Sequence, residues 1–432
     1  MGNELIVQKF GGTSVADASC LRSAAQRIAQ TKDKGYQVVV VVSAPAGMTQ
    51  SLIQKAREIN PQPDSRELDM ILATGEQLSI SLLAMSLQSM GYQAVSLTGA
   101  QIGIITDGWH THARIRNIRT DKVLSDLNQG KIPIVAGFQG ITEENEITTL
   151  GRGGSDITAT ALGCALNARE VEIYTDVEGI CTADPRIVPN ARKISEVTYE
   201  EMLEMTGSGA KVLHSRCVEL AAKKKIPIHL RSSFVPLEGT WVREGDEKME
   251  SVLVRGIAHS VREGKITLRG LDGDPETIAL LFEQIAKEQI NIDIVVQDFD
   301  LSGRMNVSFL VQRDDLDLAY AICQTFAQTD PQIALRVNRN LGKVTVIGIG
   351  MRSHAGVAAK VFRTLSDARI PIDMVSCSEI KISCVIDEEK VSLAVSALHK
   401  AFIDDEQHLL LIDKQPVGEA SASDRTGGVD HI

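Results

Sequence analysis

The stretch "VQKFGGTSVAD" (residues 7–17) decides the fold class, because it joins an apolar strand to a helix through two glycines. Lys9 lies at the end of the expected strand, and Gly11 and Gly12 follow it directly. Glycine backbone can approach a phosphate closely, and the following helix start adds the positive end of its dipole. The Walker spacing G-x-x-x-x-G-K-[ST] is absent. Taken alone, K-x-G-G fits an ordinary surface turn as well as a phosphate site.

The pattern of a strand followed by a helix continues outward to about residue 240. Helices are expected from about Asp17 to Lys34 and near 49–59. Further apolar strands are expected at 36–44, 91–99, 131–140, 171–180 and 226–233. Such strands, alternating with helices, predict an α/β fold with a mainly parallel sheet and helices on both faces. Ligands of these sheets bind at the carboxyl ends of the strands, where the glycine-rich motifs of this chain lie.

The character of the sequence changes after about residue 232. Residues 232–262 are polar and turn-rich, so we expect a linker or a partner-docking segment there. Residues 265–296 and 343–376 then repeat one order of strand, glycine-bearing loop, helix and strand, and each continues into another strand and helix. This duplication predicts two ferredoxin-like α+β units. The expected division is a catalytic domain at 1–245, linker and first unit at 246–340, a second unit at 341–412 and a disordered tail at 413–432.

Composition excludes several classes of protein. The chain of 432 residues has a net charge of −11 and only 4% aromatic residues, which argues against a nucleic-acid surface. The apolar run near residue 40 is too short to cross a bilayer. Seven cysteines without a C-x-x-C pair predict a reducing cytoplasm rather than disulfides or a cysteine zinc site. No side chain is expected to bind a metal ion directly.

The stretch "TLGRGGSDITATALG" (149–163) carries the strongest chemical pattern. An ordinary helix N-cap would explain Ser155 or Asp156. It would not explain three glycines around Arg152, which resemble an anion-binding nest with a bidentate clamp. Three other motifs are ambiguous on their own. Glu76 suits either the helix dipole or a substrate ammonium group, and Thr49 either an N-cap or a carboxylate.

The third ambiguous motif is "YTDVEGICTADPR" (174–186), which suits either a D-P turn or nucleotide binding.

In combination the motifs resemble those of the amino-acid kinase family, and specifically of the aspartate kinases. "VQKFGGTSV", "VVSAPAGMT", "LATGE", "TTLGRGGSDITA" and "YTDVEGICTADPRIV" follow that family's order and spacing, and the C-terminal duplication resembles its paired ACT regulatory domains. The resemblance extends from residue 4 to about residue 410.

The resemblance implies a cytoplasmic enzyme that phosphorylates the side-chain carboxylate of L-aspartate with ATP and Mg²⁺, giving 4-phospho-L-aspartate. This is the first step of lysine, threonine and methionine biosynthesis, and feedback by lysine, threonine or both is implied. A homodimer or higher oligomer through the ACT domains is also implied, with neither nucleic acid nor membrane as a partner.

The resemblance also assigns roles to individual residues. The implied catalytic residues are Lys9, Arg152 and Asp156. The implied ATP-binding residues are Lys9, Gly11, Gly12, Ser43, Thr175, Asp176, Asp184, Arg186 and Lys211. The implied aspartate-binding residues are Thr49, Glu76, Arg152, Gly153 and Ser155. The implied effector-binding residues are Asp272, Asp274, Asp293, Gln297, Ser353, His354, Gly356 and Asp373.

Carboxylate phosphorylation accounts for a lysine at the end of the strand. A carboxylate with a pKa of about 4 is already ionised at neutral pH and needs no general base. Because the nucleophile and the triphosphate are both negative, the site must supply positive charge and alignment. Lys9 beside two glycine N–H groups supplies both.

Two positions depart from the family pattern. Cys181 stands where many relatives carry an aromatic residue near the adenine, and Glu276 stands where relatives often carry glycine after proline. The charge of Glu276 is expected to repel an effector carboxylate at the first loop. Two other functions stay open: a glutamate kinase of the same fold, and a catalytically silent amino-acid sensor. A separate regulatory chain that starts at Met249 is also left open.

Overall fold

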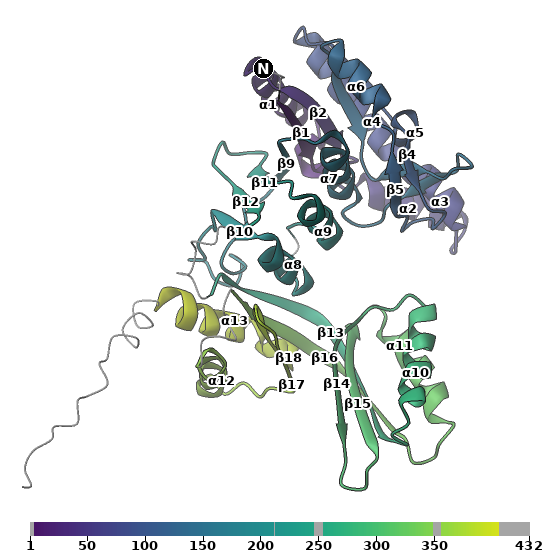
Figure 1. Ribbon diagram of the computed structural model, residues 1–432, viewed down its shortest axis with the longest axis vertical. Helices are drawn as coiled ribbons and strands as arrows, with labels where there is room; N and C mark the ends of the chain where they lie inside the picture. The colour runs from purple at the N-terminus through teal and green to yellow at the C-terminus, as the bar shows by residue number, and fades with distance from the viewer. Residues whose placement is uncertain (1–3, 211, 246–253, 349–355, 406–432) are drawn as a thin grey trace, which may run out of the picture.

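The structure is a computed structural model that describes residues 4–210, 212–245, 254–348 and 356–405. Lys211, Met249, Ser353, His354 and the expected tail at 413–432 therefore lie outside the described residues. Figure 1 shows the α/β part at the top and the part that contains the repeats below it.

The N-terminal part is built on one mainly parallel sheet, as predicted. Among the described residues it has eight strands in the order β10-β12-β11-β9-β1-β2-β6-β3, and only the β11–β12 pair is antiparallel. The strands are β1 (Leu5–Phe10), β2 (Gln37–Val42), β3 (Ala94–Leu97), β6 (Ile132–Ala136), β9 (Glu170–Thr175), β10 (Glu196–Thr198), β11 (Ile228–Ser232) and β12 (Thr240–Arg243). The strand β1, with its lysine, lies in the interior of this sheet between β9 and β2.

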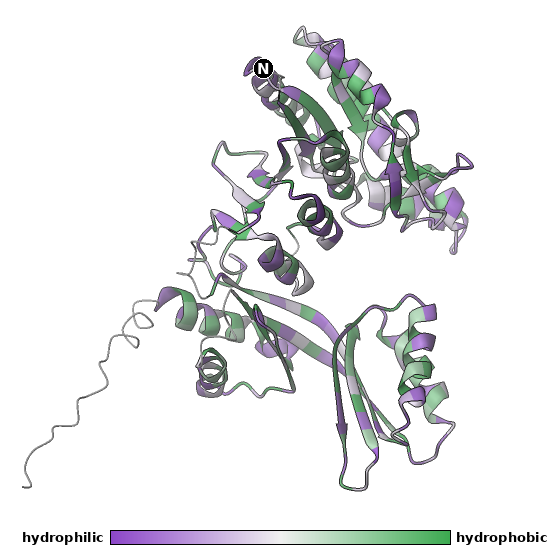
Figure 2. Ribbon diagram, in the orientation of Figure 1, coloured by the Kyte–Doolittle hydropathy of each residue, from purple (hydrophilic) through white to green (hydrophobic). Residues whose placement is uncertain are grey.

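Helices cover both faces of this sheet because each central strand is apolar on both sides. Phe10 faces a core with α1 (Ala18–Asp33) and α4 (Thr74–Ser89). Val7 faces the opposite core with α6 (Asp121–Asn128), α7 (Gly154–Leu166) and α9 (Ser215–Lys224). Side chains alternate along a strand, so Lys9 lies on the same face as Val7. Figure 2 shows hydrophobic residues of these strands in green.

The predicted helices after β1 and β2 are confirmed. Asp17 is the N-cap of α1, and its carboxylate accepts hydrogen bonds from the Ser19 and Cys20 N–H groups. The helix near 49–59 is α2 (Met48–Ile59). The remaining helical segments of this part are η1 (Gly12–Val15), α3 (Ser65–Leu72), α5 (Gly99–Ile102) and α8 (Tyr199–Gly207).

A small sheet in the N-terminal part was not predicted. Its order is β5-β4-β7-β8, and its strands are β4 (Ile104–Thr106), β5 (Ile115–Ile118), β7 (Gln139–Ile141) and β8 (Ile147–Thr149). These strands have three or four residues each, which is too short for an alternating pattern to stand out.

The prediction of a linker at 232–262 was wrong over most of its described residues. Thr240–Arg243 forms β12 of the large sheet, and Gly256–Val261 begins the long strand β13. The sequence of β12, Thr-Trp-Val-Arg, lacks the apolar run of a central strand, and only two of its residues are buried. Backbone pairing with β10 and β11 nevertheless holds it in the sheet.

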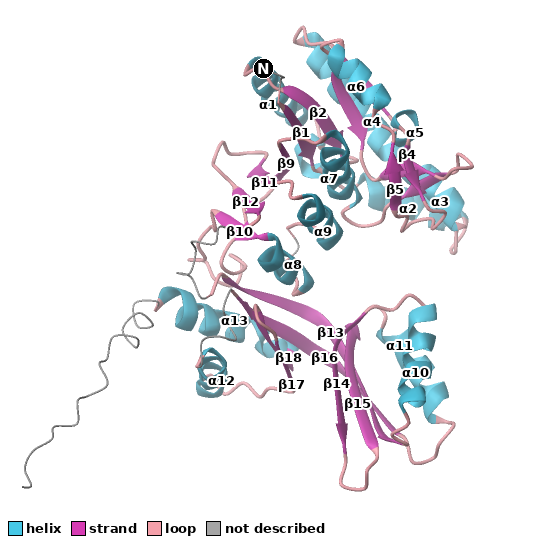
Figure 3. Cartoon of the chain, viewed as in Figure 1, coloured by secondary structure: helices cyan, strands magenta, loops and turns pink. Residues whose placement is uncertain are grey.

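The C-terminal part has a six-stranded sheet in the order β14-β15-β13-β16-β18-β17. Its strands are β13 (Gly256–Leu271), β14 (Ile292–Phe299), β15 (Met305–Gln312), β16 (Ala334–Ile347), β17 (Met374–Cys377) and β18 (Lys381–Asp387). Its helical segments are α10 (Pro275–Lys287), α11 (Leu316–Ala327), α12 (Val357–Asp367), η2 (Glu388–Lys390), α13 (Val391–His399) and η3 (Lys400–Asp404). Figure 3 shows the long strands β13 and β16 side by side, with a helix pair toward each end of the sheet.

The two repeats share their longest strands. Residues 256–260 of β13 pair with 343–347 of β16, whereas 265–269 of β13 pair with 334–338 of β16. Each long strand therefore belongs to both halves of the sheet. The expected boundary between residues 340 and 341 falls inside β16, and the domain division stays a prediction.

Several ion pairs cross between the repeats, and one of them joins Arg313 to Glu388 at 2.6 Å. Lys265 of the first repeat contacts Asp373 of the second at 2.9 Å, and Lys343 of the second contacts Asp293 of the first. Lys343 also lies 3.9 Å from Glu263, and the side chains of Lys343 and Glu263 are 4% and 1% exposed. No described residue donates a hydrogen bond to either Glu263 oxygen. Lys343 is therefore the main counter-charge of a buried carboxylate.

One helical stretch among the described residues, Ser65–Ser89, is long and apolar enough to cross a membrane by length and composition. Half of its apolar window is buried inside the molecule. Ile80, Leu83 and Leu87 of α4 pack in the core beside β2 and β6, as in a core helix of a globular domain.

We predict that Lys343→Ala lowers the free energy of unfolding of the C-terminal part by roughly 3–5 kcal/mol, because it leaves the Glu263 carboxylate buried without a partner. Lys265→Ala is the matched control. Its ion pair is more exposed, so a loss below about 1 kcal/mol is expected. Urea unfolding of both variants measures the difference. The double variant Lys343→Met/Glu263→Leu should regain most of the loss, and equal effects of the two single variants would contradict the argument.

Candidate active site

The site centres on a contact between the end of β1 and the start of α7. Lys9 Nζ lies 2.6 Å from Asp156 Oδ1, and the two side chains are 10% and 13% exposed. Asp156 is in the first turn of α7, where the helix dipole favours a negative charge. Within the described residues, no donor is aligned for a hydrogen bond to Asp156 Oδ1. The two groups meet as charges, and the ammonium group keeps donors for a further anion.

The glycines after Lys9 keep the space beside it open. A Cβ atom at Gly11 would lie 3.5 Å from Lys9 Nζ, so a larger side chain there would crowd the ammonium group. A Cβ atom at Gly12 would lie 2.7 Å from the Ala44 carbonyl oxygen. The absence of a side chain at Gly12 therefore lets the loops after β1 and β2 approach each other. Ser43 lies at this junction, and its N–H donates to the Phe10 carbonyl at 3.1 Å.

The two glycines that flank Arg152 in the loop before α7 have left-handed backbone conformations. Gly151 and Gly153 have φ angles of 76° and 68°, which other residues rarely adopt. A Cβ atom at Gly153 would also overlap the His214 side chain. Arg152 between them is exposed to solvent.

The alternative reading of Ser155 or Asp156 as the N-cap was wrong. Gly153 is the N-cap of α7, with no side-chain cap hydrogen bond, and both residues lie inside the first turn. The left-handed conformation of Gly153 starts the helix earlier than the Ser-Asp pattern suggests. A helix start without a side-chain cap can bind an anion with its first N–H groups.

Thr49 and Glu76 lie on the helices that follow the Ser43 loop. The N-cap of α2 is Gly47, so the alternative of Thr49 as an N-cap was wrong. Glu76 is only 3% exposed, and its Oε1 accepts from the Ala44 N–H at 2.9 Å. Its Oε2 accepts no hydrogen bond from a described residue. Burial raises the pKa of Glu76 to about 7, against a weaker opposing effect of the Ala44 N–H.

The nucleotide-side residues are at and after the end of β9. Thr175 is the last residue of β9, and its hydroxyl donates to Asp176 at 3.2 Å. Asp184 and Arg186 pair with each other at 2.6 Å, which lowers the pKa of the Asp184 carboxyl group. Among the described residues, no ion pair or hydrogen bond joins either of them to Lys9.

The effector-side residues lie at the loops and strand edges of the C-terminal sheet. Asp274 is the N-cap of α10 and accepts from the Glu276 N–H at 3.0 Å, while Asp272 accepts from the Asp274 N–H. Gly356 is the N-cap of α12 with a φ angle of 116°. Gln297 is exposed on β14. Asp293 and Asp373 each form an ion pair that crosses between the repeats, with Lys343 and Lys265 respectively.

The site thus places a lysine at the end of an interior parallel strand, in contact with an acid at a helix start and close to two glycines. Residues 4–232 match the model of the amino acid kinase family, and residues 344–402 match an ACT domain. The class of protein is therefore an amino acid kinase with a C-terminal regulatory region.

Comparison with individual proteins narrows this class. The chain is 48% identical to an aspartokinase of Geobacillus stearothermophilus and 46% identical to aspartokinase 2 of Bacillus subtilis, in both cases over 92% of this chain and 97% of the relative. The structure of E. coli aspartokinase III with aspartate and ADP matches with a TM-score of 0.80 at 26% identity, covering 92% of this chain and 99% of that one. The chain belongs to the aspartokinases.

Another structure of E. coli aspartokinase III, with lysine and aspartate, matches with a TM-score of 0.72 at 26% identity. It is described as the T-state, and the complex with aspartate and ADP as the R-state. These alignments cover 93% and 92% of this chain.

We predict that Glu76→Gln stabilises the ligand-free protein more at pH 8 than at pH 5. A carboxyl group whose folded pKa is raised contributes stability below its unfolded pKa, and this is lost as pH rises through the folded value of about 7. The difference approaches about 3 kcal/mol at high pH. Thermal unfolding at both pH values measures it, with Glu143→Gln on an exposed turn as the control. A gain that is independent of pH would contradict a buried, protonated Glu76.

Proposed function

We propose that this protein transfers the γ-phosphoryl group of MgATP to the side-chain carboxylate of L-aspartate, giving 4-phospho-L-aspartate and ADP. The pairing of Lys9 with Asp156 at the carboxyl end of β1 carries the proposal. Support comes from the membership of the chain in the aspartokinases and from its likeness to aspartokinase III bound to aspartate and ADP.

The reaction needs positive charge more than it needs a base. The attacking carboxylate is ionised at neutral pH, and the transferring phosphoryl group carries negative charge on its oxygens. Lys9 neutralises part of that charge, and Asp156 holds the ammonium group in place. The first N–H groups of α7 act in the same direction. Gly11 leaves room beside the ammonium group.

Two charged groups fit the two ends of the amino acid. Glu76, at the buried start of α4, would hold the substrate ammonium group, and this favours the ionised form of the carboxylate. Arg152, exposed between two glycines, would hold a carboxylate with a bidentate pair of hydrogen bonds. Thr49, Gly153 and Ser155 complete the proposed aspartate site.

The nucleotide side follows the loops after β1, β2 and β9. Gly11, Gly12 and Ser43 would approach the phosphates, and Thr175, Asp176, Asp184, Arg186 and Lys211 would bind the nucleotide. Mg²⁺ enters as the MgATP substrate and offsets the phosphate charge. Asp176 and Asp184 would lie near the phosphates and their Mg²⁺, whose bound waters a carboxylate can accept hydrogen bonds from.

We predict that Lys9→Ala lowers aspartate-dependent ADP release by roughly 10²-fold or more, the scale for losing one charge-stabilising group. Lys9→Arg keeps the charge and should retain part of the rate. The assay compares L-aspartate with L-glutamate in the presence of MgATP. Faster turnover with L-glutamate would favour the alternative of a glutamate kinase of the same fold. No turnover with either, from a folded protein that still binds amino acids, would favour the sensor.

Regulation by lysine, threonine or both is the finer part of the proposal. The loops before α10 and α12 would bind these effectors, through Asp272, Asp274, Asp293, Gln297, Ser353, His354, Gly356 and Asp373. Aspartokinase III forms a T-state complex with lysine, which supports an amino-acid effector. We further propose a cytoplasmic homodimer or higher oligomer assembled through the ACT units, with the domain division expected from the sequence.

We predict that Glu276→Gln strengthens effector binding at the first loop. Glu276 lies in the first turn of α10, next to Asp272 and Asp274, so three carboxylates crowd the place where an effector carboxylate would bind. Calorimetric titration with lysine and threonine, separately and together, measures the change, with Glu283→Gln on the same helix as the control. Absence of heat for both amino acids in the wild type would argue against effector binding.

A further inference from the structure

A buried histidine of the C-terminal helix contacts the segment that the proposed function assigns to the nucleotide. His399 is the last residue of α13 and is fully buried. Its Nε2 lies 2.9 Å from the Thr182 hydroxyl, and its Nδ1 lies 3.3 Å from Asp404 Oδ2. Thr182 is two residues before Asp184 in the sequence. A residue of the regulatory part therefore holds the chain close to the proposed nucleotide contacts.

The three side chains form a directed chain of hydrogen bonds. The Asp404 carboxylate can only accept, so a neutral His399 must carry its proton on Nδ1. His399 Nε2 then accepts the proton of the Thr182 hydroxyl. The same hydroxyl oxygen also accepts from the Arg192 N–H at 2.9 Å. With this tautomer, every hydrogen bond that links Asp404, His399 and Thr182 has one donor and one acceptor.

The backbone of Thr182 is held from the regulatory side as well. Its carbonyl accepts from the Ile257 N–H of β13 at 2.7 Å, and its N–H donates to the Arg192 carbonyl at 2.8 Å. A Cβ atom at Gly256 would lie 2.9 Å from the Thr182 carbonyl oxygen, so β13 passes very close to it. The Thr182 hydroxyl is therefore anchored to α13, and its carbonyl oxygen is anchored to β13.

Apolar packing continues this anchorage along the segment. Ala183 and Val188 are buried in the hydrophobic core that contains Leu398, Phe402 and Ile403 of the C-terminal helix. They do not belong to either core of the large parallel sheet. Ala183 and Val188 are thus packed as part of the regulatory region, although they precede β10 in the catalytic part of the sequence.

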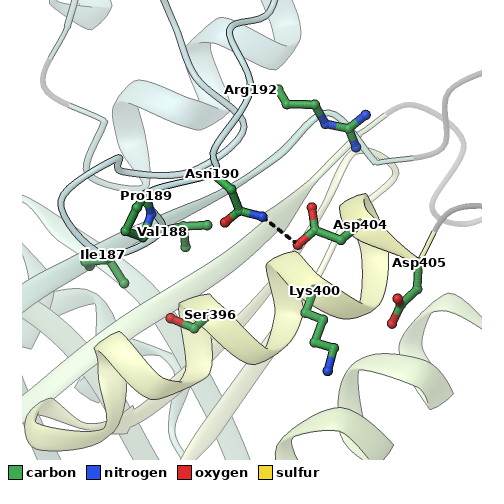
Figure 4. Close-up of a pocket in the computed structure, with 9 residues that line it drawn as sticks. All are labelled: Ile187, Val188, Pro189, Asn190, Arg192, Ser396, Lys400, Asp404 and Asp405. Carbon is green, nitrogen blue, oxygen red and sulfur yellow. Dashed lines mark hydrogen bonds between the residues drawn. The ribbon is translucent and has the colours of Figure 1, made fainter.

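A cavity of about 670 Å³ lies on the solvent side of this junction (Figure 4). Asn190 donates to Asp404 across it at 3.3 Å, and Arg192 donates to the Ile403 carbonyl. Figure 4 shows Asn190 and Asp404 facing each other from the 187–192 loop and the C-terminal helix. The loop after Arg186 is thus tied to the same helix end as His399.

We propose that His399 is a positioning residue that sets MgATP affinity by holding Thr182, and through it the Asp184–Arg186 segment. This inference rests on the proposed nucleotide role of that segment. A change in the position of α13 would then reach the nucleotide segment through one hydrogen bond and one shared core. His399 itself contacts neither substrate.

Thr182→Val tests the proposal most directly, because it removes the hydroxyl and keeps the size of the side chain. Thr182→Ser keeps the hydroxyl and is the matched control. His399→Ala removes the other partner, and His399→Gln retains a group that can bond to Thr182. Ser396→Ala changes an exposed residue that lines the same cavity without touching the chain of bonds. Circular dichroism and thermal unfolding establish that each variant is folded.

Two quantities decide the outcome: the Kd for the β,γ-imido analogue of ATP with Mg²⁺, and the separate KM values for ATP and aspartate. We expect Thr182→Val and His399→Ala to raise the Kd and the KM for ATP about tenfold, with less than a twofold change in the KM for aspartate. Thr182→Ser, His399→Gln and Ser396→Ala should stay close to wild type. If His399→Ala fails to fold, the two Thr182 variants still decide the question.

Three results would overturn the inference: unchanged nucleotide affinity in folded Thr182→Val, an equal rise in both KM values, or a wild type that binds no nucleotide. The proposed function fails in a different way. A wild type without aspartate-dependent turnover, whose nucleotide affinity still falls in Thr182→Val and not in Thr182→Ser, would refute the aspartate kinase activity and leave the role of His399 supported.

Discussion

A buried ammonium group needs a counter-charge, and the pairing of Lys9 with Asp156 meets this need at one point of the fold. Lys9 can lie there only because β1 is an interior strand whose alternate side chains face α7. Asp156 can meet it only because α7 begins at a glycine bend beside the same strand end. The pairing of the two charges therefore depends on the position of β1 and on the start of α7, and Gly11 leaves space beside the ammonium group.

Much of this arrangement follows from local patterns in the sequence. Apolar strands such as β1 and β2 are buried on both faces, which predicts a covered parallel sheet. The Asp17 cap and the residues after it predict α1 within one residue at each end. The glycines around Arg152 predict a special backbone conformation, and both flanking residues have it.

Other features depend on contacts that local patterns do not encode. Ser155 and Asp156 resemble N-caps, but the left-handed conformation of Gly153 starts α7 before them. β13 carries the polar residues His259, Ser260, Arg262 and Glu263 in its first half, so the sequence there resembles a linker. His399 belongs to no motif, and its role arises from a partner 217 residues away in the chain. The role of His399 could not be predicted from the sequence because its partner is so far away in the chain.

The shared strands make the first repeat an insert within the second. Glu263 of β13 lies opposite Leu341 of β16, so the two ends of the first repeat are already neighbours in the sheet. A short turn from Glu263 to Leu341 could replace all of the residues between them and still leave the second half of the sheet connected. In chain order, the second unit therefore begins with the first half of β13, is interrupted by the whole first unit, and resumes in the second half of β16.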